Sequence, residues 1–299
     1  FKRQFLKRLV RRLRRRFIRW RRRFRQLVIP MRKIEICCTS VADVREAFYG
    51  GAIRVELCSA ISCGGVTPSC GLISEAVKTS MSLSAEQDNS DRIRVNVLIR
   101  PREGNFCYNA SEVRTMFSDI VNCREMGVDG VVIGALTPDG DIDMEICERL
   151  VEAAEGMSVT FHRAFDLCRN PQHALEQIIS LGCNRLLTSG QKPKALEGSE
   201  LISLLVRQAG GRIIVMPGSG INPHNIAEIE RITGAEEFHS TARGAVPDVS
   251  GRIVPELGFD EPAVILPLDP DAEKADSESG QCGKRYVLRT TRNVVKLLV

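Results

Sequence analysis

The residues best suited to chemistry lie in short runs that have the composition of β-strands. Two cysteines each follow a glutamate at a spacing of two residues, Glu35 with Cys37 and Glu56 with Cys58. Side chains alternate along a strand, so each cysteine shares a face with its glutamate. If the two strands are neighbours, about 4.8 Å apart, their thiols can meet. Two thiolates suit a soft ion such as Cu(I), although two cysteines that only fill a core would have the same spacing.

A second group of polar residues could bind an anion and act on it without a metal. Guanidinium groups bind carboxylate and phosphate through paired hydrogen bonds, and imidazole with carboxylate can serve as acid and base. The candidate catalytic residues are Glu35, Glu56, Arg100, Arg102, His162, Arg163 and His239, and the candidate anion-binding residues are Ser189, Gly218, Ser219 and Gly220. The arginines and glutamates could instead pair with one another as a buried polar layer.

These residues must be positioned by strands and helices that alternate along the chain. Eight β-rich runs predict strands at Lys33–Cys38, Arg54–Cys58, Arg94–Arg100, Gly130–Leu136, Ser158–Arg163, Arg185–Gly190, Arg212–Gly218 and Glu236–Ala242. A helical stretch follows each of the first seven. Asn170 before Pro171 and Asn222 before Pro223 are helix start signals, and glycines such as Gly51 and Gly234 predict helix ends.

Eight strand–helix units predict an α/β fold, a single parallel (β/α)₈ TIM barrel over residues 31–243. An open doubly wound sheet is the alternative, but no Gly-x-Gly-x-x-Gly turn follows the first strand. In such a barrel the carboxyl ends of the strands form the mouth, where working sites lie. The polar residues named above therefore predict a site at that end.

The flanks of the barrel differ from it in composition. Residues 1–30 have apolar residues at spacings of three and four among arginines, which predicts a basic amphipathic helix. Such an arm could contact an anionic membrane or nucleic acid as an extension or targeting segment, or it could be an artefact of a mis-assigned start. Residues 244–299 are acidic and rich in proline, which predicts a loosely ordered tail, with a possible terminal helix over Arg285–Val299.

Charge and cysteine content limit the function of the barrel. Fourteen of the 42 basic residues lie in the first 25 positions, which hold no acid, so the remaining chain has 28 basic against 37 acidic residues. An acidic body is not expected to bind nucleic acid. The eleven cysteines include no Cys-x-x-Cys pair, and a chain of 299 residues needs no disulfides, which favours a reducing, intracellular compartment. No run of about 18 apolar residues predicts a membrane span.

The order of the polar motifs resembles one known family. Eight motifs are similar, in sequence order, to those of the CutC copper homeostasis proteins, at Glu35–Cys38, Val55–Cys58, Gly64–Ser69, Ile99–Arg102, Thr160–Asp166, Leu187–Gly190, Met216–Gly218 and Glu237–Ser240. The resemblance covers about residues 31–243. It implies a cytoplasmic (β/α)₈ barrel that forms homo-oligomers, a dimer or tetramer, and takes part in copper handling.

The resemblance also implies roles for particular residues. The cysteines that are proposed Cu(I) ligands in the family match Cys37 and Cys58. The family's polar mouth matches Glu35, Glu56, Arg100, Arg102, His162, Arg163, Ser189 and His239. Copper is thus the implied cofactor or cargo, and a small anionic or phosphorylated metabolite remains the alternative partner. The chain departs from the family in its arginine-rich arm and its acidic tail.

Overall fold

The computed structural model describes residues 31–86, 92–247, 263–266 and 284–299. Eight strands alternate with helices in this part of the chain, as predicted. The strands are β1 (Lys33–Cys38), β2 (Arg54–Leu57), β3 (Arg94–Leu98), β4 (Gly130–Ile133), β5 (Ser158–Phe161), β6 (Arg185–Thr188), β7 (Ile214–Pro217) and β8 (Glu237–Ser240). The helices that follow them are α2 (Val41–Gly50), α3 (Cys70–Glu86), α4 (Ala110–Glu125), α5 (Met144–Ala153), α6 (Pro171–Ser180), α7 (Ser199–Ala209) and α8 (Ile226–Thr233).

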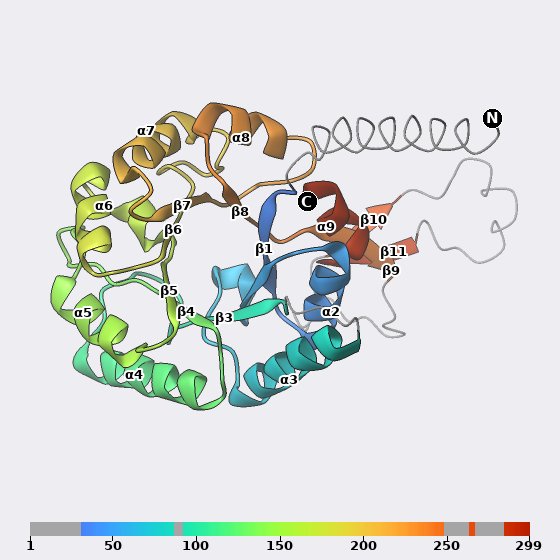
Figure 1. The fold of residues 1–299 in the computed structure, drawn as a ribbon, viewed down its shortest axis with the longest axis horizontal. Helices are drawn as coiled ribbons and strands as arrows, with labels where there is room; N and C mark the ends of the chain where they lie inside the picture. Colours follow the sequence, from blue (N-terminus) through green and yellow to red (C-terminus); the bar gives the residue numbers. More distant parts are fainter. Residues whose placement is uncertain (1–30, 87–91, 248–262, 267–283) are drawn as a thin grey trace, which may run out of the picture. The chain divides into compact units, whose positions relative to one another are not determined.

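The strands form a parallel barrel. They are ordered β7-β6-β5-β4-β3-β2-β1-β8, and β7 and β8, the two ends of this order, lie beside each other. The paired strands run parallel, with β1 flanked by β2 and β8. The helices lie outside the ring of strands (Figure 1). This arrangement confirms the predicted (β/α)₈ barrel, and it places the carboxyl ends of the strands at one end of the barrel.

Alternate side chains of a strand face opposite ways, and for β1 this separates an outer core from the barrel interior. Ile34 and Ile36 of β1 face outward, where they pack with α2 residues in the large core between strands and helices. Glu35 and Cys37, which alternate with these isoleucines, face the barrel interior. There Cys37 belongs to a small apolar cluster. The interior of the barrel therefore holds the polar and sulfur side chains, as the alternation predicts.

Local signals set the bounds of the helices. The Asn170 side chain caps α6 by accepting a hydrogen bond from the His173 N–H, and Pro171 follows it, as predicted. The prediction that Asn222 caps the next helix is wrong, because α8 begins only at Ile226. The Asn222 side chain instead accepts the N–H of His224 and closes a turn before the helix. Gly51 ends α2 in a left-handed conformation, at φ 95°, as expected of a glycine stop.

A small antiparallel sheet follows the barrel. It consists of β9 (Arg243–Pro247), β10 (Ala263–Leu266) and β11 (Lys284–Thr290), in the order β10-β11-β9. The predicted terminal helix is therefore only half correct: its first part is β11, and α9 (Arg292–Leu298) forms the rest. Valine and threonine favour the strand, as their branched side chains do in general.

Helix α9 packs against α2. Val295 lies close to Gly50: a Cβ atom added to Gly50 would be only 2.4 Å from the Cβ of Val295. Arg292 pairs with Glu46 at 3.0 Å and lies over the ring of Tyr49. The end of the chain thus covers the first helix of the barrel. The predicted arm at residues 1–30, and most of the predicted loose tail, lie outside the described residues.

Candidate functional site

Two thiols meet inside the barrel near the carboxyl ends of β1 and β2. The Sγ atoms of Cys37 and Cys58 lie 3.3 Å apart, and neither cysteine is in a disulfide. Cys58 is only 1% exposed, and the pair packs against Leu98 and Val132 from β3 and β4. The structure thus places the two predicted metal ligands next to each other, on the faces that strand alternation assigned to them.

The surroundings of Cys37 favour its neutral thiol form. The hydrogen bond with Cys58, together with burial, raises the pKa of Cys37 well above its usual value. Nearby Glu56 and Cys38 raise it further by charge repulsion. A ligand that needs thiolate must therefore displace a proton, as soft metal ions do when they bind thiols.

Glu56 and His239 extend the thiol pair to a cluster with metal-ligand chemistry. One donor atom each from Cys37, Glu56 and His239 lies within 4.8 Å of the other two. Burial raises the pKa of Glu56 to about 7, the effect of Glu35 adding to it and that of His239 opposing it. Its Oε2 atom has no hydrogen-bond partner among the described residues. A carboxyl oxygen buried without a partner is costly, and this one is available to a ligand.

His239 is oriented by a buried carboxylate. Its Nδ1 lies 2.8 Å from Glu35 Oε1, which leaves Nε2 to other partners. Burial alone would lower the pKa of His239, but Glu56 and Glu35 outweigh it and raise the pKa. A carboxylate behind a histidine is the arrangement that usually orients a metal-binding imidazole.

An ion-pair network lies beneath this cluster. The Arg54 guanidinium pairs with Glu35 and, at 2.6 Å, with Glu237, and Arg185 reaches the same Glu237 oxygen at 3.0 Å. Burial alone would raise the pKa of Glu35, but Arg54 and His239 lower it to about 2. Arg54, Arg185 and Glu237 were not among the predicted site residues. Alternation could have found Arg54, which lies two residues before Glu56 and therefore on the same face.

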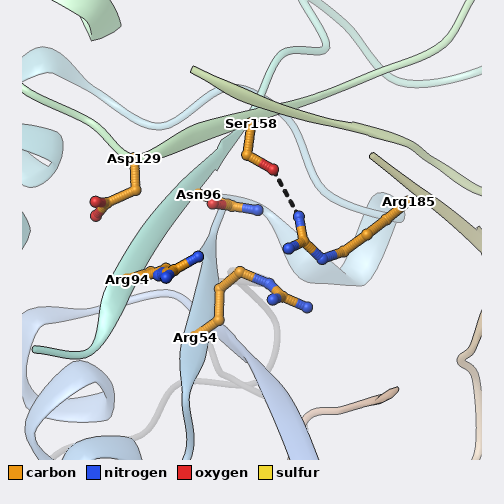
Figure 2. A pocket seen from close by; sticks show the side chains of 6 residues that line it. All are labelled: Arg54, Arg94, Asn96, Asp129, Ser158 and Arg185. Atoms are coloured by element: carbon orange, nitrogen blue, oxygen red, sulfur yellow. Dashed lines mark hydrogen bonds between the residues drawn. The ribbon is translucent and has the colours of Figure 1, made fainter. Parts of the chain in front are cut away.

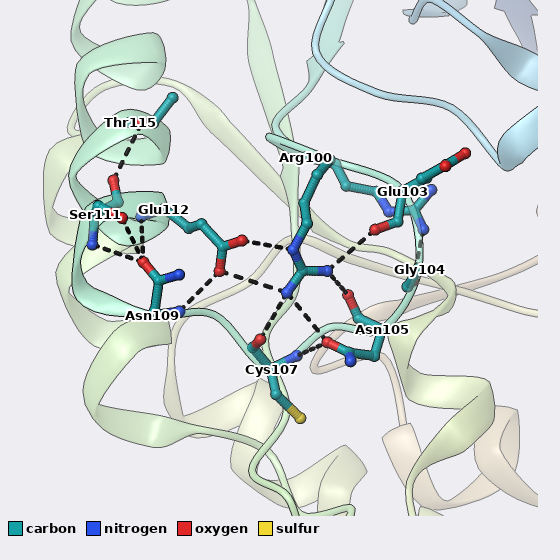
Figure 3. A network of polar contacts seen from close by, with 10 residues as sticks. Arg100, Glu103, Gly104, Asn105, Cys107, Asn109, Ser111, Glu112 and Thr115 are labelled. Atoms are coloured by element: carbon teal, nitrogen blue, oxygen red, sulfur yellow. Dashed lines mark hydrogen bonds and ion pairs between the residues drawn. The ribbon is translucent and has the colours of Figure 1, made fainter.

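Arg100 and Arg102 hold loops together. The Nη1 atom of Arg100 donates to the carbonyls of Cys63 and Gly65, and Nη2 donates to that of Gly104. The guanidinium of Arg102 pairs with Glu112 and donates to the carbonyls of Asn105 and Cys107. Figure 3 shows Glu112, Asn105 and Cys107 around the start of α4. Most N–H groups of these two arginines are therefore used by the protein itself.

His162 and Arg163 lie at the end of β5 with different surroundings. The Nδ1 atom of His162 accepts the N–H of Ala164, while Nε2 is buried without a partner among the described residues. Burial lowers the pKa of His162 to about 3, so the ring is neutral. Arg163 pairs with Asp166 and donates to the hydroxyl of Ser189, both at 2.8 Å.

The predicted anion-binding residues also have partners within the protein. The Ser189 hydroxyl donates to Asp166 or to the Lys192 carbonyl, and that of Ser219 donates to the carbonyl of Pro193 at 2.8 Å. Gly218 lies close to His239, and the carbonyl of Gly220 accepts side-chain amides that precede α8. The structure thus brings together Glu35, Cys37, Glu56, Cys58 and His239, with Gly218 beside the histidine. The other predicted residues lie in loop contacts of their own.

The fold and the site together define a parallel eight-stranded barrel with a buried thiol pair at the carboxyl ends of its first two strands. The sequence model of the CutC family matches residues 32–244, and the chain belongs to the CutC family. A CutC family protein of Parabacteroides distasonis is 53% identical over 215 residues, which span 72% of this chain and 84% of that protein. One from Bacteroides thetaiotaomicron is 50% identical over 214 residues, which span 72% and 82%.

Solved structures agree with this assignment. The crystal structure of a CutC protein of Streptococcus agalactiae, provisionally assigned to copper homeostasis, superposes with a TM-score of 0.66 at 35% identity. It covers 71% of this chain and 99% of its own. A Rubisco-like protein of Rhodopseudomonas palustris, at 14% identity and a TM-score of 0.51, shares the fold alone. Among the described residues, no helix has the length and apolar character needed to cross a membrane.

Proposed function

We propose that this protein takes part in copper homeostasis by binding Cu(I) through the thiolates of Cys37 and Cys58. The observation that carries the proposal is the 3.3 Å separation of the two Sγ atoms inside the barrel. Thiolates are the protein ligands that Cu(I) prefers. The provisional assignment of the Streptococcus agalactiae relative to copper homeostasis supports the same function.

The surroundings of the thiols fit a soft cation as cargo. Leu98 and Val132 line one side and exclude water, which protects a thiolate-bound ion from competing ligands. Glu56 Oε2, without a partner among the described residues, is available as a third ligand or as acceptor of a thiol proton. Each thiol would lose its proton on binding, and the single positive charge of Cu(I) would offset one of the two thiolate charges. His239 stays oriented by Glu35 throughout.

A competition titration tests this proposal. The reduced protein is titrated with Cu(I) against a chromophoric chelator, beside the Cys37→Ser/Cys58→Ser double variant. We expect the double variant to lose more than about a hundredfold in affinity, beyond the 10–100-fold that follows loss of a supporting group. Cys38→Ala is the matched control, since Cys38 lies on the same strand but faces the outer core. Equal affinity of the double variant and the wild type would refute the proposal.

A metal-independent enzyme acting on a small anionic or phosphorylated metabolite is the second candidate. It is favoured by His162, whose Nδ1 accepts a hydrogen bond, so that the neutral ring carries its proton on a buried, unpartnered Nε2. The internal contacts of Arg100, Arg102 and Arg163 weigh against it. Crystals soaked in phosphate test it: an anion bound to His162 Nε2 supports this function, and an empty mouth contradicts it.

We further propose that the protein is cytoplasmic and forms a homo-oligomer. The ten cysteines among the described residues are all free thiols, which suits a reducing compartment. Light scattering coupled to size-exclusion chromatography would give the oligomeric state. A dimer or tetramer is expected, and a monomer at micromolar concentration would contradict the proposal.

A further inference from the structure

A polar cavity, here called the amino-end cavity, lies at the opposite end of the barrel from the thiols. It has a volume of about 210 Å³ and opens among the first residues of several strands. Its lining, shown in Figure 2, is strongly basic and consists of Arg54, Arg94, Asn96, Asp129, Ser158 and Arg185. No candidate metal ligand or predicted mouth residue is among them, so the cavity is separate from the thiol site.

The charges around this cavity leave one arginine without a counter-ion. On the side of the barrel interior, Arg54 pairs with Glu35 and Glu237, and Arg185 pairs with Glu237. The guanidinium of the exposed Arg94 pairs with no carboxylate of the described residues. Burial, together with the charge of Arg54, lowers the pKa of Arg185. The cavity thus holds more positive charge than its own carboxylates balance.

The single carboxylate in the lining does not neutralise this excess. Asp129 Oδ1 accepts from Arg92 at 2.5 Å, and Oδ2 accepts the N–H of Val95 at 2.8 Å. Asp129 is thereby held by partners outside the cavity, and Arg92 offsets its charge. An incoming anion would meet an acid that is already paired.

A buried amide without partners points to a missing ligand. Asn96 is 1% exposed, and neither its Oδ1 nor its Nδ2 has a hydrogen-bond partner among the described residues. Figure 2 shows its side chain pointing toward the space that the three arginines surround. Gly130 leaves the room for it, since a Cβ there would lie 2.5 Å from Asn96 Oδ1. Buried polar groups are almost always paired, so an unpaired amide in a basic cavity needs an explanation.

Ser158 adds a hydrogen-bond donor to the cavity. Its hydroxyl accepts from Arg185 Nη1 at 2.6 Å, so its own proton remains free to donate. Together with Arg94 and the Asn96 amide, it supplies donors of the kind that bind tetrahedral oxyanions. Guanidinium groups are the strongest of these, because they bind phosphate oxygens in pairs.

We propose that the amino-end cavity binds a small oxyanion of the phosphate class, through Arg94, Asn96 and Ser158, with Arg54 and Arg185 behind them. The cavity is smaller than the roughly 300–1,000 Å³ of pockets for drug-sized ligands, which limits the ligand to inorganic phosphate or the phosphoryl group of a small ester. The site is a binding site and takes no part in catalysis, since barrel enzymes react at the other end. It goes beyond the copper function and does not depend on it.

Calorimetric titration of the metal-free protein with inorganic phosphate, at constant ionic strength in chloride, tests the proposal. Arg94→Gln is expected to raise the dissociation constant about tenfold, the loss of one charged hydrogen-bonding partner. Arg207→Gln is the matched control, because Arg207 lies on α7 and contacts Ser203. Its dissociation constant should equal that of the wild type. No phosphate binding by the wild type, or equal binding by Arg94→Gln, overturns the proposal.

Two further measurements test whether Asn96 contacts the anion and whether the ligand is free phosphate or a phosphate ester. Asn96→Leu should weaken phosphate binding while the circular dichroism spectrum stays that of the wild type. Unchanged binding by a folded Asn96→Leu variant would remove the amide from the site and overturn this assignment. Glycerol phosphate that binds more tightly than inorganic phosphate would identify an ester as ligand, and the reverse order a free anion. Acetate that competes as well as phosphate would overturn the phosphate class.

Discussion

The two ends of the barrel interior surround their buried polar groups differently. At the carboxyl end, Cys37 and Cys58 lie among apolar side chains, and Glu56 nearby has no hydrogen bond to its Oε2. At the amino end, Arg54 and Arg185 are buried as charges and paired with two glutamates. At the carboxyl end the thiols and Glu56 can accept a cation, whereas the amino end already holds several arginines. The difference indicates that ligands of opposite charge suit the two ends.

The largest loss of stability should come from breaking the ion-pair network at the amino end. Arg54→Met would leave Glu35 and Glu237 buried with a lost partner. Removing one member of a buried pair costs about 3–5 kcal/mol, so we expect a loss of that size in the free energy of unfolding measured in urea. Arg212→Met is the control, since it removes an exposed pair with Glu176 and should change stability little. An equally small change in both variants would show that the network does not stabilise the barrel.

A pH-dependent effect should separate Glu56 from the paired glutamates. Its pKa in the folded protein, about 7, lies above the usual 4.5, so the folded state binds more protons between these values. Stability should therefore fall as pH rises from about 4.5 to 7 and level off above, by up to about 3 kcal/mol. Glu56→Gln should lack this fall and should be more stable than the wild type at pH 8. Parallel pH profiles of the two proteins would contradict the account.

The smallest effect is expected from the unpaired amide at the amino end. Asn96→Leu replaces a buried polar group without partners by an apolar one of similar size. Without phosphate, we expect the variant to be as stable as the wild type or more stable by about 1 kcal/mol. Leu98→Ala, on the same strand and face, should instead cost about 2–5 kcal/mol through loss of buried volume. A strong destabilisation by Asn96→Leu would show that the amide has partners in solution.

The strands and the thiol pair could be predicted from the sequence, because alternation and parallel order need only local patterns. Six of the eight predicted strands start at the residue where the structure starts them, and the predicted β3 runs on to Arg100, past its end at Leu98. The strand ends at Leu98 and the chain bends from Pro101, so alternation no longer assigns the direction of Arg102. This is why Arg102 pairs with Glu112 on α4.

The amino-end network could not be predicted in the same way. Alternation places Arg54 on the face of Glu56, but an arginine that begins a strand has the pattern of an exposed strand end. Nothing local indicates that Arg54 and Arg185 pair with buried glutamates whereas Arg94 does not. Closure of the barrel places β2, β6 and β8 around one interior, and only then do Arg54 and Arg185 share Glu237. These ion pairs depend on the closure of the barrel, so the sequence pattern of a single strand cannot predict them.

X-ray absorption at the copper edge tests whether Cys37 and Cys58 bind Cu(I). The protein is loaded with one equivalent of Cu(I) under reducing conditions, and the neighbours of the ion are counted in the wild type and in Cys37→Ser/Cys58→Ser. We expect two sulfur neighbours in the wild type and their loss in the double variant. Only nitrogen and oxygen neighbours in the wild type, or two sulfurs retained in the double variant, would contradict it.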